Sequence, residues 1–212
     1  MRYVFLIVFI FNLQLNYAQE IGLLKYNGGG DWYANPTSLP NLIKFCNANI
    51  KTKIALKAVT IEPNNPNIFD YPYIHATGHG NIVFSDQEIK NIRDYIFSGG
   101  FLHIDDNYGM DKYVRKEIKR LFPDIALVAL PASHKIFQVP YTFSSGLPKI
   151  HEHENQKPEA FAIIINNRIG LLYTFETDLG DGWEDQEVHN NPKEVREKAL
   201  KMGANIIHYC FN

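Results

Sequence analysis

The chain lacks an excess of basic residues and any repeated or low-complexity segment. Its 21 basic and 23 acidic residues give a net charge of −2, which does not resemble the basic footprint of a nucleic-acid binder. The composition, 45% hydrophobic and 21% charged, is that of a globular chain rather than a disordered one. We therefore expect one domain, large enough to bury a core, that has no nucleic-acid partner.

Cysteine is also scarce, since the chain holds only Cys46 and Cys210. Cys46 lies on the apolar face of the first predicted helix, and Cys210 lies just beyond the last one. The first and last helices of a doubly wound sheet can share a face. A disulfide between the two is therefore one interpretation, and two buried free thiols are the other.

An unbroken apolar run at the N-terminus predicts export. Arg2 precedes this run over residues 4–11, and the small residue Ala18 stands before Gln19. The pattern predicts a secretory signal peptide over residues 1–18, too short to span a bilayer, with an uncleaved anchor as the alternative. The mature chain, residues 19–212, is expected to be periplasmic or secreted, without a transmembrane span.

Strands and helices are expected to alternate through the first part of the mature chain. Ser85 and Glu88 form a capping-box pattern at the start of one helix, and Asp111 is a candidate cap of the next. Alternation of this kind predicts parallel βαβ crossovers and a three-layer α/β sandwich. Apolar and β-branched runs predict five strands, over residues 21–26, 56–61, 73–77, 101–104 and 125–130.

The second half of the chain departs from this alternation. Residues 161–166 and 169–175 are apolar runs joined by a short turn, which predicts an antiparallel hairpin at one edge of the sheet. Asn191 and Pro192 then supply a cap and a first-turn proline for a last helix. We therefore expect a mostly parallel sheet with an antiparallel edge hairpin.

Polar residues follow several of the predicted strands. Ligands of open α/β sheets bind outside the carboxyl ends of the strands, so these residues are the candidate binding set for a small polar ligand. The tryptophans in this set could stack on a sugar ring or, alternatively, pack their loops against the domain. The set comprises Gly28, Gly29, Gly30, Asp31, Trp32, Gly78, Gly80, Asn81, Asn107, Asp178, Asp181 and Trp183.

Histidines and carboxylates in the same region suggest a divalent metal such as zinc, manganese or iron. The candidate ligands are His79, Asp105, Asp106, His151 and His153, and the first three are also the candidate catalytic residues. The alternative is that these side chains cap loops and hydrogen-bond one another. In particular, Asp106 and Asn107 can form an Asx-turn.

Motifs for nucleophilic catalysis and for phosphate binding are weak. A nucleophile elbow needs Cys, Ser or Thr at the sharp turn, and the turn after the third strand holds Gly78-His79-Gly80. The three glycines at residues 28–30 match neither a P-loop nor a dinucleotide fingerprint.

The chain closely resembles a bacterial family known only as domain of unknown function 4159. The resemblance covers nearly all of the mature chain and lies in GGGDWYANP, TGHGN, GGFLHIDDNYGMD, GLPKIHEHE, DLGDGWED and KALKMGANIIHY. It implies the class I glutamine amidotransferase-like fold, a flavodoxin-like sandwich, and more distantly the order of segments resembles the ThuA-like branch. True amidotransferases carry a cysteine where this chain has Gly78 and His79, so glutaminase activity is not expected.

Two functions stay open. The first is a non-amidotransferase ligand-binding or interaction domain of the cell envelope, whose polar loops grip a ligand or an envelope partner. The second is a metal- or acid/base-dependent hydrolase or isomerase that acts on a polar substrate such as a carbohydrate. Because no complete catalytic constellation is readable in the sequence, the binding function is favoured.

Overall fold

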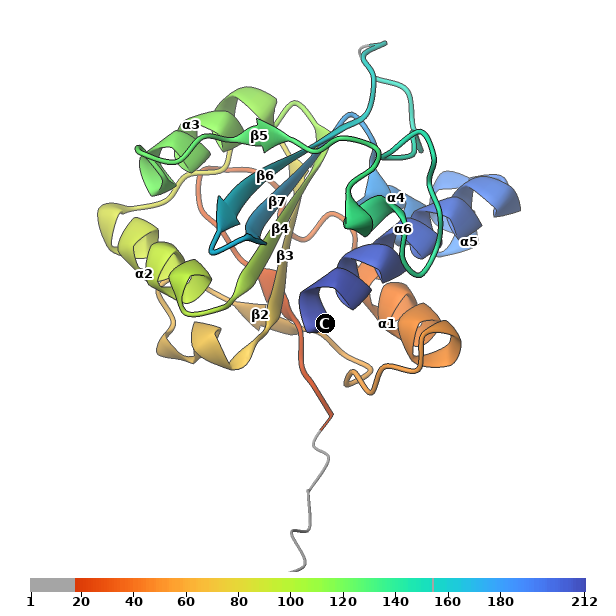
Figure 1. Ribbon diagram of the computed structural model, residues 1–212, viewed down its shortest axis with the longest axis horizontal. Helices are drawn as coiled ribbons and strands as arrows, with labels where there is room; N and C mark the ends of the chain where they lie inside the picture. The colour runs from red at the N-terminus through yellow and green to blue at the C-terminus, as the bar shows by residue number, and fades with distance from the viewer. Residues whose placement is uncertain (1–17, 154) are drawn as a thin grey trace, which may run out of the picture.

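The computed structural model describes residues 18–153 and 155–212 (Figure 1). The predicted signal peptide, residues 1–18, lies outside the described residues apart from Ala18. Among the described residues, no helix has both the length and the apolar composition needed to cross a membrane.

A seven-stranded sheet forms the centre of the described structure. Its strands are β1 (Gly22–Leu24), β2 (Val59–Ile61), β3 (Tyr73–His79), β4 (Phe101–Tyr108), β5 (Val128–Ala129), β6 (Glu159–Ile165) and β7 (Arg168–Phe175). They lie in the order β2-β1-β3-β4-β7-β6-β5. Neighbours from β2 to β7 are parallel, whereas β7–β6 and β6–β5 are antiparallel pairs. The mostly parallel sheet and the β6–β7 hairpin are thus confirmed.

Helices cover both faces of this sheet. They are α1 (Ser38–Asn49), α2 (Asp86–Phe97), α3 (Asp111–Leu121), α4 (Leu179–Trp183), α5 (Gln186–His189) and α6 (Lys193–Phe211), with short 3₁₀ turns η1 (Pro66–Asp70) and η2 (Lys135–Phe137). In Figure 1, α2 and α3 lie on one face, and α1, α4 and α6 lie on the other.

The core has two halves because successive strand residues point to opposite faces of the sheet. Tyr73 of β3 packs in the half beneath α1 and α6, and the next residue, Ile74, packs in the half beneath α2 and α3. Both side chains are fully buried, as expected of a strand covered on both faces. The predicted three-layer, flavodoxin-like α/β sandwich is confirmed.

The strands differ from the predicted bounds, and three of these differences change which residues lie in the sheet. β4 continues to Tyr108, so Asp105 and Asp106 lie inside the strand rather than in the loop after it. Their buried carboxylates find hydrogen-bond partners, which lets a polar segment continue a central strand. β2 begins at Val59, since Leu56 is 66% exposed. β5 covers two exposed residues and adds a short outer strand to the antiparallel edge formed with the β6–β7 hairpin.

The predicted helix caps hold at one helix and fail at two. The capping box of α2 is confirmed, because Ser85 and Glu88 each accept a hydrogen bond from the backbone of the other. Asp111 is not the cap of α3, since it lies inside the first turn. Asn191 does not cap α6, because Pro192 takes the cap position and the Asn191 amide is used elsewhere.

Both cysteines are free thiols. Burial raises the pKa of Cys46 to about 12 and that of Cys210 to about 12 as well. The Cys210 Sγ atom lies 3.4 Å from the carbonyl oxygen of Pro72. Of the two interpretations of this pair, the structure therefore has the free thiols.

Candidate functional site

The site lies at the carboxyl edge of the sheet, next to the point where strand order reverses. The chain passes from β1 to β2 on one side and from β3 to β4 on the other, so the reversal lies between β1 and β3. The loops after β1, β3 and β7 and the end of β4 meet at this edge through direct hydrogen bonds. This is the place where open α/β sheets bind ligands.

Two histidines converge on Asp178, which follows β7. The Oδ2 atom of Asp178 lies 3.2 Å from Nδ1 of His151 and also contacts Nε2 of His153. One ligand atom from each of the three residues can be chosen so that all lie within 4.8 Å of one another. The Asp178 side chain is 0% exposed, and the two histidine side chains are 22% and 24% exposed. The cluster is therefore closed on its carboxylate side and accessible on its histidine side.

His151 is held at both ring nitrogens. Its Nε2 atom lies 2.8 Å from Oδ1 of Asn191, an acceptor, which places a proton on Nε2. Its Nδ1 atom faces the carboxylates of Asp178 and Asp181, and the hydrogen bonds to them raise the pKa of His151 to about 10. The metal-free imidazole is thus a cation at neutral pH, and a metal would displace the proton on Nδ1.

Asp181 extends the cluster toward a third histidine. Its Oδ2 atom lies 3.4 Å from Nδ1 of His151 and 3.6 Å from Nε2 of His189. Its Oδ1 atom accepts hydrogen bonds from the amides of Asn35 and Asn107. Burial opposes ionisation, but the hydrogen bonds from His151 and Asn35 outweigh it and lower the pKa of Asp181.

Asp178 has a left-handed backbone conformation and one carboxylate oxygen that lacks a hydrogen-bond partner among the described residues. Its φ angle is 59°, in the left-handed region, and Glu176 two residues earlier has a φ of 56°. Such conformations cost non-glycine residues on the order of 1–3 kcal/mol and concentrate at functional sites. The Oδ1 atom of Asp178 is buried and has no hydrogen-bond partner among the described residues. A cation in the cluster would compensate that oxygen.

The donor set fits a divalent metal. Two imidazole nitrogens and one carboxylate are a ligand combination used by zinc and iron, and three protein ligands leave coordination positions open for water or a ligand. Asn191 behind His151 matches the outer partners that orient ligating histidines. Of the five predicted metal ligands, the structure brings His151 and His153 together and adds Asp178, which the sequence placed in the ligand-binding set.

Asp105 lies beneath this cluster in a fully buried position. Its carboxylate accepts hydrogen bonds from Thr174 Oγ1 and from the backbone N of Gly180, the latter at 2.7 Å. Burial raises the pKa of Asp105 to about 8, although these hydrogen bonds act in the opposite direction. His103, also buried, continues the chain of contacts, with Nε2 2.9 Å from Thr174 Oγ1. Asp105 therefore supports the loop that carries Asp178.

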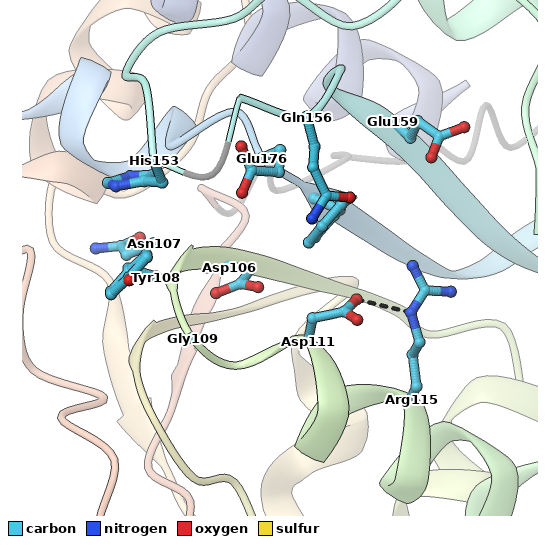
Figure 2. A pocket seen from close by; sticks show the side chains of 11 residues that line it. Asp106, Asn107, Tyr108, Gly109, Asp111, Arg115, His153, Gln156, Glu159 and Glu176 are labelled. Atoms are coloured by element: carbon cyan, nitrogen blue, oxygen red, sulfur yellow. Dashed lines mark hydrogen bonds and ion pairs between the residues drawn. The ribbon is translucent and has the colours of Figure 1, made fainter.

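Asp106 lines a pocket beside the cluster. Figure 2 shows this pocket, with Asp106 and Tyr108 on the β4 side and His153 and Glu176 across from them. Asp106 accepts hydrogen bonds from the Met110 backbone N at 3.0 Å and from the Tyr173 hydroxyl at 3.2 Å, so it also closes the turn before α3. Burial raises the pKa of Asp106 to about 6.

His79 pairs with Asp31 rather than with the cluster. The Nδ1 atom of His79 lies 3.0 Å from Oδ2 of Asp31, and the backbone N of His79 donates to Oδ1. The two glycine-rich loops that carry them are joined by a hydrogen bond from the backbone N of Gly30 to the carbonyl of Asn81. The remaining glycines of the predicted binding set, Gly28, Gly29, Gly78 and Gly80, lie in or beside the same two loops.

Three other residues of the predicted binding set are committed to the protein itself. Asn107 is buried and hydrogen-bonds to Asn35 and Asp181. Trp183 is fully buried with Nε1 donating to the Ala199 carbonyl, so it offers no ring face to a sugar. Trp32 packs its loop against the core beneath α2 and α3.

Sequence reasoning missed His189 and Asn191. His189 lies at the end of α5, four residues after Asp185. The sequence pattern favours Asn191 as a helix cap, because an asparagine before a proline and a helical pattern is typical of one. The sequence does hold a signal for His189: it is a third histidine near Asp178 and Asp181 along the chain, and histidines and carboxylates that cluster are typical of metal sites.

Comparison with known proteins gives a family and no curated relative. None of the curated proteins matches the chain. The model of the family described as Domain of unknown function (DUF4159) matches residues 20–211, which include every strand and helix of the sandwich and all the residues of the cluster. The chain therefore belongs to the DUF4159 family.

Proposed function

We propose that this protein is an exported, metal-dependent binding protein of the cell envelope. A divalent transition metal such as zinc is held by His151, His153 and Asp178, and a small polar ligand binds at its open positions and in the adjoining pocket. The observation that carries this proposal is the buried Asp178 carboxylate. One of its oxygens faces two imidazoles, and the other has no hydrogen-bond partner among residues 18–153 and 155–212.

The charges of the cluster support a cation at this place. Asp178 and Asp181 bring two carboxylates into a largely buried position, with side chains 0% and 10% exposed. Buried charge is costly unless it is paired. In the absence of metal, a proton on His151 supplies part of the compensation, which is why its pKa is raised to about 10. A divalent cation supplies more charge and displaces that proton.

Titration calorimetry with zinc and manganese tests the proposal. We expect the protein to bind one equivalent and the His151→Ala/His153→Ala variant to bind at least about a hundredfold more weakly. His208→Ala is the matched control, because His208 lies on α6 and contacts Asn212. Failure of the wild-type protein to bind either metal, or equal binding by the double variant, would contradict the proposal.

A second candidate function is metal-dependent hydrolysis or isomerisation of a polar substrate such as a carbohydrate. Asp106 favours it, because this carboxyl group lines the same pocket as His153 and burial raises its pKa to about 6. A general base with such a pKa operates well near neutral pH. Turnover of nitrophenyl glycosides by metal-loaded protein, lost in Asp106→Asn while zinc affinity is kept, would favour the enzyme over the binding protein.

The class I glutamine amidotransferase-like superfamily, with the ThuA-like branch as a distant relative, is the proposed origin of this fold. The flavodoxin-like sandwich supports it, as does the loop at the end of β3, where His79 replaces the nucleophilic cysteine of amidotransferases. We therefore expect no release of ammonia from glutamine. Measurable glutaminase activity of the purified protein would contradict this substitution of the nucleophile.

Export is proposed from the apolar run before Ala18. The expected product begins at Gln19 and is recovered outside the cytoplasm. N-terminal sequencing of the protein from a periplasmic or culture fraction tests this, and an intact N-terminus in the membrane fraction would favour an uncleaved anchor.

A further inference from the structure

His79 is fixed by Asp31 through both its backbone and its ring. Asp31 Oδ1 accepts from the backbone N of His79, and the Nδ1 atom of His79 lies 3.0 Å from Oδ2 and 3.2 Å from Oδ1. Because a carboxylate only accepts hydrogen bonds, Nδ1 carries the proton. The Nε2 atom then presents its lone pair, on a side chain that is 47% exposed.

Two glycines are required for this approach. A Cβ atom on Gly30 would lie 2.8 Å from the His79 carbonyl oxygen and 2.7 Å from the Asn81 carbonyl oxygen. A Cβ atom on Gly78 would lie 2.9 Å from both the carbonyl and a carboxylate oxygen of Asp31, and the Gly78 φ of +140° also disfavours a side chain. The two loops therefore approach this closely because neither position carries a Cβ atom.

The pair lies beside the proposed ligand site. His79 is the register partner of Tyr108 between β3 and β4, and the next residue, Gly80, donates a hydrogen bond to the Tyr108 carbonyl. The Tyr108 ring lies 5.0 Å from the His153 ring and lines the pocket of Figure 2. Tyr108 thus joins the backbone at the end of β3, where His79 lies, to the pocket beside the metal cluster.

A surface ion pair is a weaker account of this geometry. Exposed pairs of this kind contribute about 0–1 kcal/mol and need no fixed ring orientation. Here the Asp31 carboxylate hydrogen-bonds to both the backbone and the ring of His79. The two loops that carry these residues approach closely only because Gly30 and Gly78 lack a Cβ atom. This is the arrangement by which a carboxylate sets the tautomer of a histidine that acts as a general base.

We propose that Asp31 and His79 form an acid–base dyad for a hydroxyl-bearing ligand bound beside Tyr108, which rests on the ligand site proposed above. The Nε2 atom of His79 takes the proton of the hydroxyl group. The O–H bond breaks with its electron pair left on oxygen, an N–H bond forms, and Asp31 stabilises the imidazolium. The proton then returns to the ligand or to solvent.

Acylation of histidines by diethyl pyrocarbonate, with the modified peptides quantified by mass spectrometry, tests the dyad. In Asp31→Asn, we expect the amide oxygen to accept the hydrogen bond from the His79 backbone N–H, so that the amide NH₂ group faces Nδ1 of His79. The ring proton then moves from Nδ1 to Nε2, and Nε2 no longer has a free lone pair. We expect His79 to be acylated about tenfold more slowly in Asp31→Asn than in the wild type, with His208 unchanged. An unchanged His79 rate would overturn the dyad.

Nitrogen chemical shifts of the His79 ring give a second readout that needs no variant. The dyad predicts the Nδ1–H tautomer in the wild type, and an Nε2–H tautomer would overturn it. The two proposals can fail separately, because His151→Ala/His153→Ala should remove zinc binding and leave the acylation rate of His79 as in the wild type. Loss of zinc binding in Asp31→Asn would mean that Asp31 serves the metal site instead, and would also overturn the dyad.

Discussion

The buried carboxylate of Asp105 accepts a hydrogen bond from the backbone N of Gly180 at 2.7 Å. Gly180 lies in α4 between Asp178 and Asp181, so this contact joins the central strand β4 to the loop that carries the acidic part of the cluster. A Cβ atom at Gly180 would lie 3.0 Å from Oγ1 of Thr77 and 3.3 Å from Oδ2 of Asp105. The position of the cluster thus depends on close packing of this loop against buried polar groups of the sheet.

Asp105→Asn should flatten the dependence of stability on pH. Burial raises the pKa of Asp105 from 3.8 to about 8. Between these values the folded state keeps a proton that the unfolded state has released, so the free energy of unfolding falls as pH rises. Over this range Asp105 lowers the free energy of unfolding by about 1.4 kcal/mol per pH unit. Urea unfolding at pH 6.5 and 7.5 should give a steeper fall in the wild type than in Asp105→Asn, and equal falls would contradict this role of Asp105.

Asn191→Ala should weaken the metal site without removing a ligand. The amide oxygen of Asn191 holds the Nε2 proton of His151 at 2.8 Å and so orients Nδ1 toward the cluster. Loss of such outer partners lowers metal affinity by about 10–100-fold. Calorimetric titration with zinc measures the change. An affinity equal to that of the wild type would show that His151 needs no partner at Nε2.

Gly30→Ala should separate the two glycine-rich loops. Its Cβ atom would lie within 2.8 Å of two backbone oxygens, from Asn81 and His79, which cannot move as a flexible side chain can. We expect slower acylation of His79 and lower thermal stability. Gly29→Ala controls for backbone strain alone, because its φ of +90° disfavours a side chain while its Cβ atom would meet none of the described residues within 4 Å. Normal His79 reactivity in Gly30→Ala would argue against the close approach.

Gly182→Ala should loosen the contact between α4 and α6. The new Cβ atom would lie 2.4 Å from the Cβ atom of Ala199, and overpacking of this kind costs about 1–3 kcal/mol. Ala199→Gly alone costs about 1 kcal/mol as a helix-interior glycine. The double variant should recover stability relative to Gly182→Ala, as measured by urea unfolding. Additive losses would mean that the two positions do not press on each other.

Much of the fold could be predicted because local patterns and burial agree there. Ser85 and Glu88 signal the start of α2, and the continuous apolar runs of β3 and β7 are typical of strands buried on both faces of a sheet. The end of β4 could not be read in this way. Asp105 and Asp106 look like loop residues in sequence, and only partners from distant segments, such as Thr174 and Gly180, make their burial in a strand possible.

The meeting of these loops at the carboxyl edge was predictable, but the pairing of their side chains in the candidate site was not. Strand ends identify the carboxyl edge, and His151 and His153 were among the predicted metal ligands. The order of residues does not show which loops approach one another, so the predicted metal-ligand set includes His79 together with His151 and His153. In the structure, His79 pairs with Asp31, and His151 pairs with Asp178. Nothing local marks Asp178 as the buried carboxylate between the two histidines.

Zinc affinity of Asp178→Asn, measured beside the wild type, tests the central claim most directly. The substitution keeps the size of the side chain and removes the charge that faces both histidines. We predict one zinc per wild-type molecule and at least about a hundredfold weaker binding by Asp178→Asn, because the carboxylate that faces both imidazoles is lost. Equal zinc affinity of the two proteins, or no zinc bound by the wild type, would contradict the account.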